Sequence, residues 1–254
     1  MGSKITFIPK RVIVLSPEVQ EILFALGAGK SIVGHTRHCD FPPESRSIPL
    51  VGDFKNPDME KILSLKPDLV FVTDYIQKDT IFILKKLKIR HIVVYSKNLK
   101  EMFKNISFIG GIFAKEETAE RIINNMKDQI ANLKRPKEKP VIFPLIWDNP
   151  VFTAGDETII NDVIETAGGQ NISKRYGKNY FRVDEEFLLS SDIDIFLFCD
   201  PTINKDSTLM KMVKKNNPLI KIISQIHPDT LLRASPRLLE GIKELNRIIH
   251  EKDL

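Results

Sequence analysis

The first 96 residues alternate short, β-branched apolar runs with amphipathic stretches of helical period. Four runs have the composition of buried strands: RVIVL (11–15), SIVGHT (31–36), DLVFVT (68–73) and HIVVYS (91–96). Three stretches between them have helical spacing: SPEVQEILFALGAG (16–29), NPDMEKILSLK (56–66) and IFILKKLKI (81–89). The first two are expected to be capped by Ser16 and Asn56, each followed by a proline. This alternation predicts a parallel sheet with helices on its faces.

Segment 99–133 has a different pattern, because its apolar residues keep helical spacing throughout without a proline. It predicts one long helix, bent near Gly110 and Gly111, since each glycine costs about 1 kcal/mol relative to alanine within a helix. The basic segment KRPKEKP (134–140) contains two prolines and is expected to end this helix.

Strand and helix patterns alternate again after residue 140. The segments are VIFPLIW (141–147), ETIINDVIETAGG (157–169), EEFLLSS (185–191), DIFLFCD (194–200), STLMKMVKKN (207–216), IKIIS (220–224) and SPRLLEGIKELNRIIHE (235–251). The paired glycines at 168–169 are typical of a helix C-cap. The predicted fold is therefore α/β, with two small lobes joined by one long rigid helix. The predicted domains are 1–96, 97–139 for the helix and its linker, and 140–254.

One helix-then-strand pattern occurs twice. NPDMEKILSLKPDLVF (56–71) is matched by FRVDEEFLLSSDIDIFLF (181–198). Glu60 and Glu186 are 126 residues apart, as are Asp68 and Asp194. Any two helix-strand units of an α/β fold look alike, and an acid in the first turn is favoured by the helix dipole by about 0.3–1 kcal/mol. The pattern alone leaves open whether the two glutamates have a further role.

Composition narrows the class of protein. The chain is 42% hydrophobic and 28% charged, without a biased tract, which is typical of a globular protein. Its net charge of +5 comes from basic residues in short scattered groups such as KKLKIR (85–90), so no nucleic-acid partner is predicted. An anionic ligand or an acidic membrane surface stays open, although a solvated face is the favoured interpretation.

Targeting signals are weak. No run of about 20 apolar residues occurs, so no membrane span is predicted. The start, MGSKITFIPKRVIVLSP, lacks the apolar centre of a signal peptide, but its MGS is typical of residues added for expression. Two cysteines, Cys39 and Cys199, are too few for a disulfide framework. These features leave the compartment open.

Two short motifs point to chemistry that their context does not support. GAGKS (27–31) is part of a phosphate-binding pattern, but Phe24 stands where that pattern needs a glycine, and the segment ends a helix. HTRHCD (35–40) offers potential zinc ligands, yet closely spaced ligands on one loop cannot complete a tetrahedral site. Hydrogen bonding in a polar loop is favoured. Ligation by His35 or His38, directly or axially to haem iron, is the alternative.

Three blocks of the sequence resemble one known family. Residues 11–71, RVIVLSPEVQEILFALGAGKSIVGHTRHCDFPPESRSIPLVGDFKNPDMEKILSLKPDLVF, are similar to the N-terminal lobe of class III (helical-hinge) solute-binding proteins. These proteins serve ABC importers for cobalamin, haem and ferric siderophores. FPLIWDNPVFTAGDETIINDVIETAGGQNI (143–172) and LLRASPRLLEGIKEL (231–245) are similar to blocks of the C-terminal lobe, most closely in the cobalamin-binding branch. The resemblance implies a ligand cleft between two lobes.

The resemblance also implies a partner. In the family a glutamate on each lobe docks into arginine pockets of the permease, and the matching positions are Glu60 in NPDMEKIL and Glu186 in VDEEFLL. A carboxylate that meets a fork of arginine donors makes orientation-fixing bidentate bonds. Glu185 leaves the second register open by one residue. We therefore expect a monomeric extracytoplasmic protein, in the periplasm or on the outer face of the membrane, with a lipid anchor as one mode of attachment.

Loops that follow strands are expected to line the ligand cleft. Flat conjugated macrocycles bind aromatic faces and a few placed polar groups. The predicted ligand contacts are His38, Phe54, Tyr75, Trp147, Phe152, Tyr180, Asp229 and Thr230, with Asp53 and Asp74 in the same loops. His38, Phe54 and Thr73 stand where the cobalamin branch has tryptophan, tyrosine or another large aromatic.

The expected ligand is a metal chelate, with a corrinoid favoured and haem or a ferric siderophore as the alternative. No enzymatic activity and no cofactor are expected, because no nucleophile or general-base constellation can be assembled from these spacings. The rival from another class is a metal chelatase, which would need an acidic partner for His35, His38 or His227.

Overall fold

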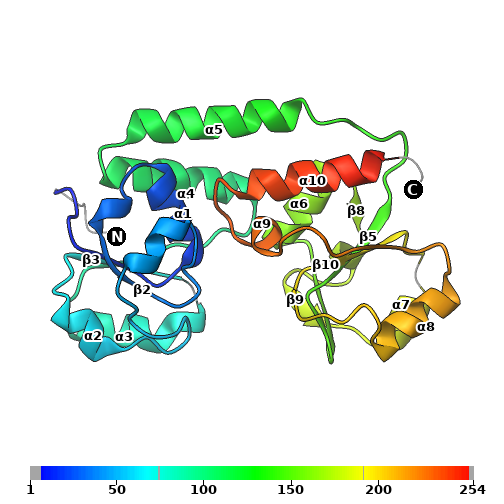
Figure 1. Ribbon diagram of the computed structural model, residues 1–254, viewed down its shortest axis with the longest axis horizontal. Helices are drawn as coiled ribbons and strands as arrows, with labels where there is room; N and C mark the ends of the chain where they lie inside the picture. The colour runs from blue at the N-terminus through cyan, green and yellow to red at the C-terminus, as the bar shows by residue number, and fades with distance from the viewer. Residues whose placement is uncertain (1–6, 74, 191, 252–254) are drawn as a thin grey trace. The chain divides into compact units, whose positions relative to one another are not determined.

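The computed structural model describes residues 7–73, 75–190 and 192–251 (Figure 1). The chain divides into two compact units. Unit 1 comprises Met1–Ser96, Lys100–Asn125 and Ala234–Pro236, and unit 2 comprises Lys97–Leu99, Met126–Arg233 and Arg237–Leu254. Each unit contains a parallel sheet with helices on it, so the predicted α/β fold is confirmed.

Unit 1 is built on a parallel sheet with the strand order β2-β1-β3-β4. The strands are β1 (Val12–Val14), β2 (Ile32–His35), β3 (Leu69–Val72) and β4 (His91–Val93). The helices are α1 (Pro17–Ala25), α2 (Met59–Ser64), α3 (Lys78–Lys86) and most of α4 (Leu99–Ile112), with the 3-10 turns η1 (Gly29–Ser31), η2 (Pro43–Ser47) and η3 (Tyr75–Gln77). Each strand and helix predicted before residue 97 is present.

The sheet of unit 1 is buried on both faces. On one face Val70 of β3 packs with Ile62 of α2 and Leu84 of α3. On the other face the ring of Phe71 stacks on Phe113, with ring centroids 6.4 Å apart. Figure 1 shows α2 and α3 on one side of this sheet. The continuous apolar run LVFV is what a strand between two helix layers requires.

Two predicted helix caps differ in the structure. Ser16 occupies the N-cap position of α1, but its Oγ is buried with no hydrogen-bond partner among the described residues. Helix α2 begins at Met59 rather than Pro57, because Asp58 Oδ1 accepts a hydrogen bond from the backbone N–H of Lys61 at 3.1 Å. Asp58, not Asn56, is therefore the cap.

The predicted single helix over 99–133 is two helices, α4 and α5 (Glu116–Ala131). The break lies at 113–115, where Ala114 adopts the left-handed region with φ 52°. Gly110 lies within α4, which continues to Ile112. A Cβ at Gly110 would be 2.6 Å from the Cβ of Ala119, so this glycine lets α4 and α5 approach closely. Among the described helices, none combines the length and the apolar character that a bilayer span needs.

Unit 2 has a parallel sheet of order β11-β10-β5-β8 and an antiparallel sheet of order β6-β7-β9. The strands are β5 (Val141–Leu145), β6 (Trp147–Asp148), β7 (Val151–Ala154), β8 (Gln170–Asn171), β9 (Tyr180–Arg182), β10 (Ile195–Phe198) and β11 (Lys221–Ile223). The helices are α6 (Ile159–Ala167), α7 (Glu185–Ser190), α8 (Thr208–Asn216), α9 (Asp229–Leu232) and α10 (Leu238–His250), with the 3-10 turn η4 (Ile172–Arg175). Gly168 is the left-handed C-cap of α6, with φ 97°, as predicted.

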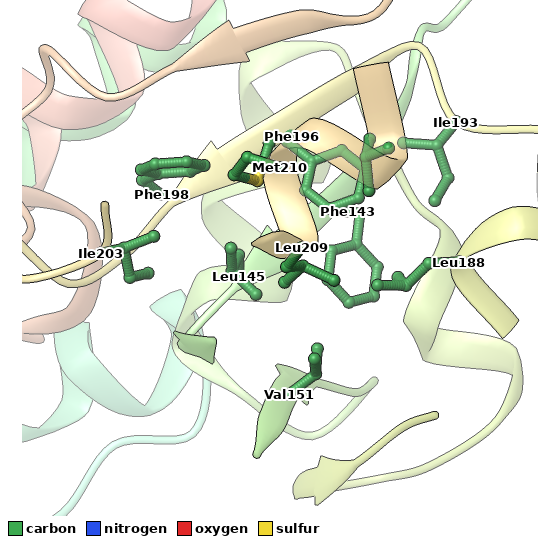
Figure 2. Close-up of a cluster of buried hydrophobic side chains, with 11 residues drawn as sticks. Phe143, Leu145, Val151, Leu188, Ile193, Phe196, Phe198, Ile203, Leu209 and Met210 are labelled. Atoms are coloured by element: carbon green, nitrogen blue, oxygen red, sulfur yellow. The ribbon is translucent and has the colours of Figure 1, made fainter. Parts of the chain in front are cut away.

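The core of unit 2 centres on two phenylalanines (Figure 2). Phe143 of β5 and Phe196 of β10 are fully buried, with ring centroids 5.1 Å apart. Leu188 of α7 and Met210 of α8 complete the cluster from the helices. The same cluster therefore ties α7 to the central strands of the sheet.

The helix-strand repeat seen in the sequence is also present in the bounds of the helices and strands. Adding 126 to the bounds of α2 gives those of α7, and adding 126 to the bounds of β3 gives those of β10. The caps match as well, because Asp184 Oδ1 accepts from Phe187 N at 2.8 Å as Asp58 accepts from Lys61 N. The repeat is thus a property of the three-dimensional structure and not only of the sequence.

The aspartates at the strand entries have a structural role. Asp68 Oδ2 accepts from the backbone N–H groups of Lys10 at 2.7 Å and Arg11 at 3.1 Å, just before β1. Asp194 Oδ2 accepts from Val141 N at 2.7 Å, at the start of β5. Each carboxylate satisfies a backbone donor that the adjacent strand would otherwise leave unpaired.

Candidate functional site

The two repeated glutamates occupy equivalent positions. Glu60 and Glu186 each lie two residues after the aspartate that caps their helix. The shared cap settles the register on structural grounds and makes Glu186, rather than Glu185, the counterpart of Glu60. Both side chains are exposed, and neither has an ion pair within the part of the chain that the structure describes. Both carboxylates are therefore accessible to another molecule.

Unit 1 brings two of the predicted ligand contacts together. His38 follows β2 and is exposed, and Phe54 is half-buried in the loop that precedes α2. Their rings meet edge to face, with centroids 6.3 Å apart. Beside them Arg37 Nε lies 3.1 Å from Asp53 Oδ1 in an exposed ion pair. Tyr75 begins η3, but its side chain lies outside the described part of the structure, as does Asp74.

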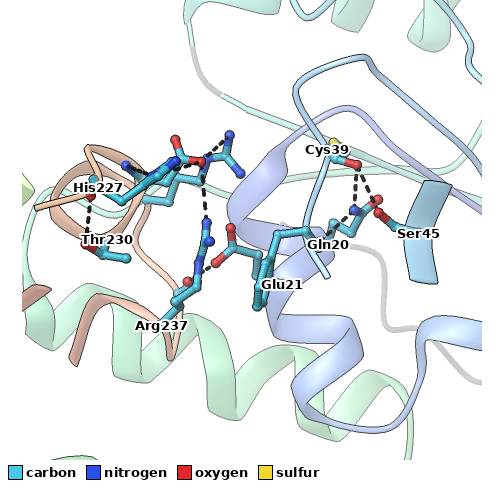
Figure 3. A network of polar contacts seen from close by, with 11 residues as sticks. Gln20, Glu21, Cys39, Ser45, His227, Thr230 and Arg237 are labelled. Carbon is cyan, nitrogen blue, oxygen red and sulfur yellow. Dashed lines mark hydrogen bonds and ion pairs between the residues drawn. The ribbon is translucent and has the colours of Figure 1, made fainter. Parts of the chain in front are cut away.

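Two buried glutamines hold the loops that carry these rings. Gln77 accepts from Thr73 N at 2.9 Å through Oε1, and its Nε2 donates to Phe54 O at 2.7 Å. Gln20 donates through Nε2 to the carbonyl of Cys39 at 2.7 Å (Figure 3) and to that of Phe41 at 2.8 Å. Sequence reasoning missed both, since a glutamine in a helical pattern carries no sign of which backbone groups it will reach.

His35 is a structural residue. Its Nδ1 donates to Gln20 Oε1 at 2.7 Å, and only 3% of the residue is exposed. Burial lowers the pKa of His35 below its usual value, because it disfavours the charged ring. Within residues 7–73, 75–190 and 192–251 no three histidine, cysteine, aspartate or glutamate side chains are placed to hold a metal ion. Cys39 and Cys199 are both buried and are not joined in a disulfide.

The antiparallel sheet of unit 2 gathers three predicted aromatic contacts on one face. Phe152 of β7 lies directly opposite Trp147 of β6 and Arg182 of β9, so these three side chains form a row across the sheet. Tyr180 pairs with Ala154, two residues along β7, and so lies on the same face. Trp147 is 44% exposed and Tyr180 38%, while Phe152 is half-buried and Arg182 exposed. We call Trp147, Phe152, Tyr180 and Arg182 the aromatic face.

The opposite face of this sheet is buried, which fixes the orientation of the strands. Val151 belongs to the core of unit 2, and Thr153 is fully buried, donating to Pro144 O at 2.9 Å. The indole of Trp147 is held by its Nε1–H, which donates to Asn149 O at 2.8 Å. A one-residue shift in register would therefore bury the aromatic face and expose Val151 and Thr153.

Arg182 is the member of the aromatic face that sequence reasoning missed. It has no ion pair to any residue that the structure describes. Only the pairing of β9 with β7 places it beside Phe152. The face can thus offer one guanidinium, with its five donors, next to three aromatic rings.

The predicted contacts Asp229 and Thr230 have local partners. Asp229 Oδ2 pairs with Arg233 at 2.9 Å and Arg237 at 3.5 Å. Thr230 is buried, and its hydroxyl donates to His227 O at 2.7 Å (Figure 3). A Cβ at Gly241 of α10 would be 2.1 Å from Thr230 O, so this backbone is pressed against α10. Both residues serve the packing of α9, and their role toward a ligand stays a prediction.

A family model described as periplasmic binding protein matches residues 12–221. Curated relatives include an uncharacterised ABC transporter substrate-binding lipoprotein of Bacillus subtilis, 27% identical in an alignment of 260 positions that covers 95% of this chain and 80% of that protein. The vitamin B12-binding protein of Salmonella typhimurium is 27% identical over 240 residues, which cover 92% of this chain and 88% of that protein.

Solved structures share the fold. A periplasmic haem-binding protein of Vibrio cholerae superposes with a TM-score of 0.83 at 21% identity, over 94% of this chain and 98% of that chain. The periplasmic vitamin B12-binding protein of Vibrio cholerae gives 0.78 at 21% identity, over 97% and 100%. Since the family model covers most of the chain and these folds agree along nearly its whole length, the chain belongs to the periplasmic binding protein family.

Proposed function

We propose that this protein is the extracytoplasmic substrate-binding subunit of an ABC importer and that its ligand is a metal chelate of the corrinoid type. The observation that carries the proposal is the aromatic face, where Trp147, Phe152 and Tyr180 lie on one side of a small sheet. Flat conjugated ligands bind such faces. The names of the Bacillus subtilis and Salmonella relatives support the transporter class and the corrinoid.

Arg182 favours a second candidate, which is haem or a ferric siderophore. A guanidinium binds carboxylates through two parallel hydrogen bonds and stacks on aromatic rings. The peripheral side chains of a corrinoid are mostly neutral amides, whereas haem carries two carboxylates. An exposed arginine beside Phe152 therefore suits an anionic chelate.

We propose binding without catalysis. The chelatase alternative needs a histidine with an acidic partner, and His227 Nδ1 lies 3.7 Å from Asp229 Oδ2. This distance is too long for a hydrogen bond, and the carboxylate is engaged by Arg233 and Arg237. His38 and Phe54 of unit 1 are proposed as further contacts of the ligand, and Glu60 and Glu186 as the contacts of the permease.

A titration tests the function. Trp147 is the single tryptophan, so its fluorescence reports on the aromatic face. Cobalamin, haemin and several ferric siderophores are titrated separately, and one of them is expected to quench the signal saturably at a one-to-one ratio without being converted. If none of them changes the fluorescence or the melting temperature, the protein does not bind a metal chelate.

Removing a ring of the aromatic face should weaken binding. Phe152→Ala is expected to raise the Kd of the bound chelate about tenfold, because a stacked ring contributes on the order of 1 kcal/mol beyond its buried area. Isothermal calorimetry measures the effect. Phe108→Ala, which removes a 51% exposed ring of α4, is the matched control and should leave Kd unchanged. Equal affinities of Phe152→Ala and the unmodified protein for the chelate would show that this ring does not take part in ligand binding.

A further inference from the structure

The outward face of α3 combines apolar and basic side chains. Phe82 is 67% exposed, and Ile83 and Leu87 are 37% and 46% exposed. Residues four apart are neighbours on a helix, so Lys78 and Lys86 flank the ring of Phe82 at both ends, and Leu87 follows Ile83. An apolar patch of this kind on one helix, bordered by ammonium groups, is unusual for a surface that meets only water.

The ring of Phe82 is not among the side chains that hold α3 on the core. Thr80 and Leu84 are the buried residues of the helix, and Leu84 belongs to the core of unit 1. They point away from Phe82, because positions two residues apart lie on opposite sides of a helix. Replacement of Phe82 therefore leaves the core contacts of α3 intact.

The local charge of this region is strongly positive. Segment 78–90 has five basic residues and one acid, Asp79, so its charge is 5 − 1 = +4, compared with +5 for the whole chain. The basic residues are Lys78, Lys85, Lys86, Lys88 and Arg90, and all are exposed. None of these lysines has an ion pair in the described part of the chain. The guanidinium of Arg90 lies 4.9 Å from the ring centroid of Phe7, which adds a partly exposed aromatic to this region.

Helix α8 of unit 2 shows that the fold does not require an exposed phenylalanine. Both α3 and α8 have a lysine pair in the last turn and precede the edge strand of their sheet. Phe82 lies two residues after the buried Thr80, and the residue two after the buried Leu209 is Lys211. The exposed ring of α3 thus has no counterpart on α8.

We propose that the α3 face, formed by Phe82, Ile83, Leu87 and the basic residues of segment 78–90, binds a lipid bilayer with anionic headgroups. Aromatic and aliphatic side chains enter the boundary between headgroups and acyl chains, while lysines extend their ammonium groups to the phosphates. The local charge of +4 is complementary to an anionic leaflet. This surface is independent of the aromatic face, so the lipid proposal can fail while the ligand proposal stands, and the reverse.

Vesicle sedimentation with the full chain tests the proposal. The protein is expected to bind vesicles that contain phosphatidylglycerol, to bind pure phosphatidylcholine weakly, and to be released by salt. Lys85→Gln with Lys86→Gln should lower the affinity about 30-fold, because each basic residue near an anionic surface contributes on the order of one kcal/mol. Phe82→Ser should lower it about tenfold.

The lysine pair of α8 supplies the matched control. Lys214→Gln with Lys215→Gln removes the same charge from the same place in a helix and should leave vesicle binding within about twofold. Equal losses of vesicle affinity for the two double variants would mean that only the net charge matters, and this would overturn the proposal. Equal binding to vesicles with and without phosphatidylglycerol would also overturn it. It is also overturned if Phe82→Ser dissociates a dimer of the protein, or if only vesicles that contain the permease bind.

Discussion

The double variant Glu60→Arg with Glu186→Arg is expected to abolish ligand uptake in cells that depend on this protein and to leave ligand affinity unchanged. Both carboxylates are exposed and lie two residues after the cap of their helix. Disrupting a desolvated charge pair at an interface costs about 2–5 kcal/mol per site, and two reversals would replace two attractions by repulsions. Uptake of the labelled chelate and calorimetric Kd are measured on the same variant.

First-turn acids elsewhere provide the control for this experiment. Glu116→Arg with Glu117→Arg makes the same charge change in the first turn of α5, where the same unfavourable interaction with the helix dipole arises. This variant should transport normally. Uptake by the Glu60 and Glu186 variant at the level of this control would contradict the docking role, and weakened ligand binding would show that the substitutions act elsewhere.

Phe196→Ala is expected to lower the free energy of unfolding of unit 2 by about 3–5 kcal/mol. The ring is fully buried against Phe143 in the middle of the core, so the substitution leaves a cavity that neighbouring helices fill only in part. Urea unfolding followed by the fluorescence of Trp147 reports on this unit, because the single tryptophan belongs to it. The midpoint should fall with little change in the slope.

Two further variants provide comparisons for the loss of unfolding free energy in Phe196→Ala. Phe196→Leu keeps most of the side-chain volume. It should lower the free energy of unfolding less than Phe196→Ala does, by about 1 kcal/mol or more. Phe108→Ala removes an exposed ring and should stay within about 0.5 kcal/mol of the unmodified protein. Similar losses for Phe196→Ala and Phe108→Ala would mean that the core does not have the packing described.

The alternation of strands and helices could be predicted from the sequence because packing on both faces of a sheet dictates the spacing of apolar residues. Buried strands are continuous apolar runs, and the helices that cover them have apolar residues at helical spacing. The break between α4 and α5 could not be predicted. The paired glycines pointed to a bend at 110–111, but the chain turns at Ala114, a residue with no preference for the left-handed region. Gly110 is a glycine because α5 comes back against it, a contact invisible in the local sequence.

The candidate site could be predicted only in part, because the sequence shows which residues are aromatic but not how the short strands pair. Trp147, Phe152 and Tyr180 could be nominated as aromatic residues in loops, but their common face results from the pairing of short strands. Arg182 joins them through the same pairing, and no periodicity marks a strand of three residues. Gln20 and Gln77 were missed for a related reason, since their partners lie up to 62 residues away.

The two helix-strand repeats have matching bounds and caps, and this matters for any partner that binds both repeats. Each repeat presents a glutamate in a capped helix of six residues followed by a buried strand of four. A homodimer translated from one gene displays every surface feature twice. If the partner is such a homodimer, one recognition pocket encoded once would be offered to both carboxylates, and a single compensating mutation in its gene would be expected to offset a charge reversal made at both positions.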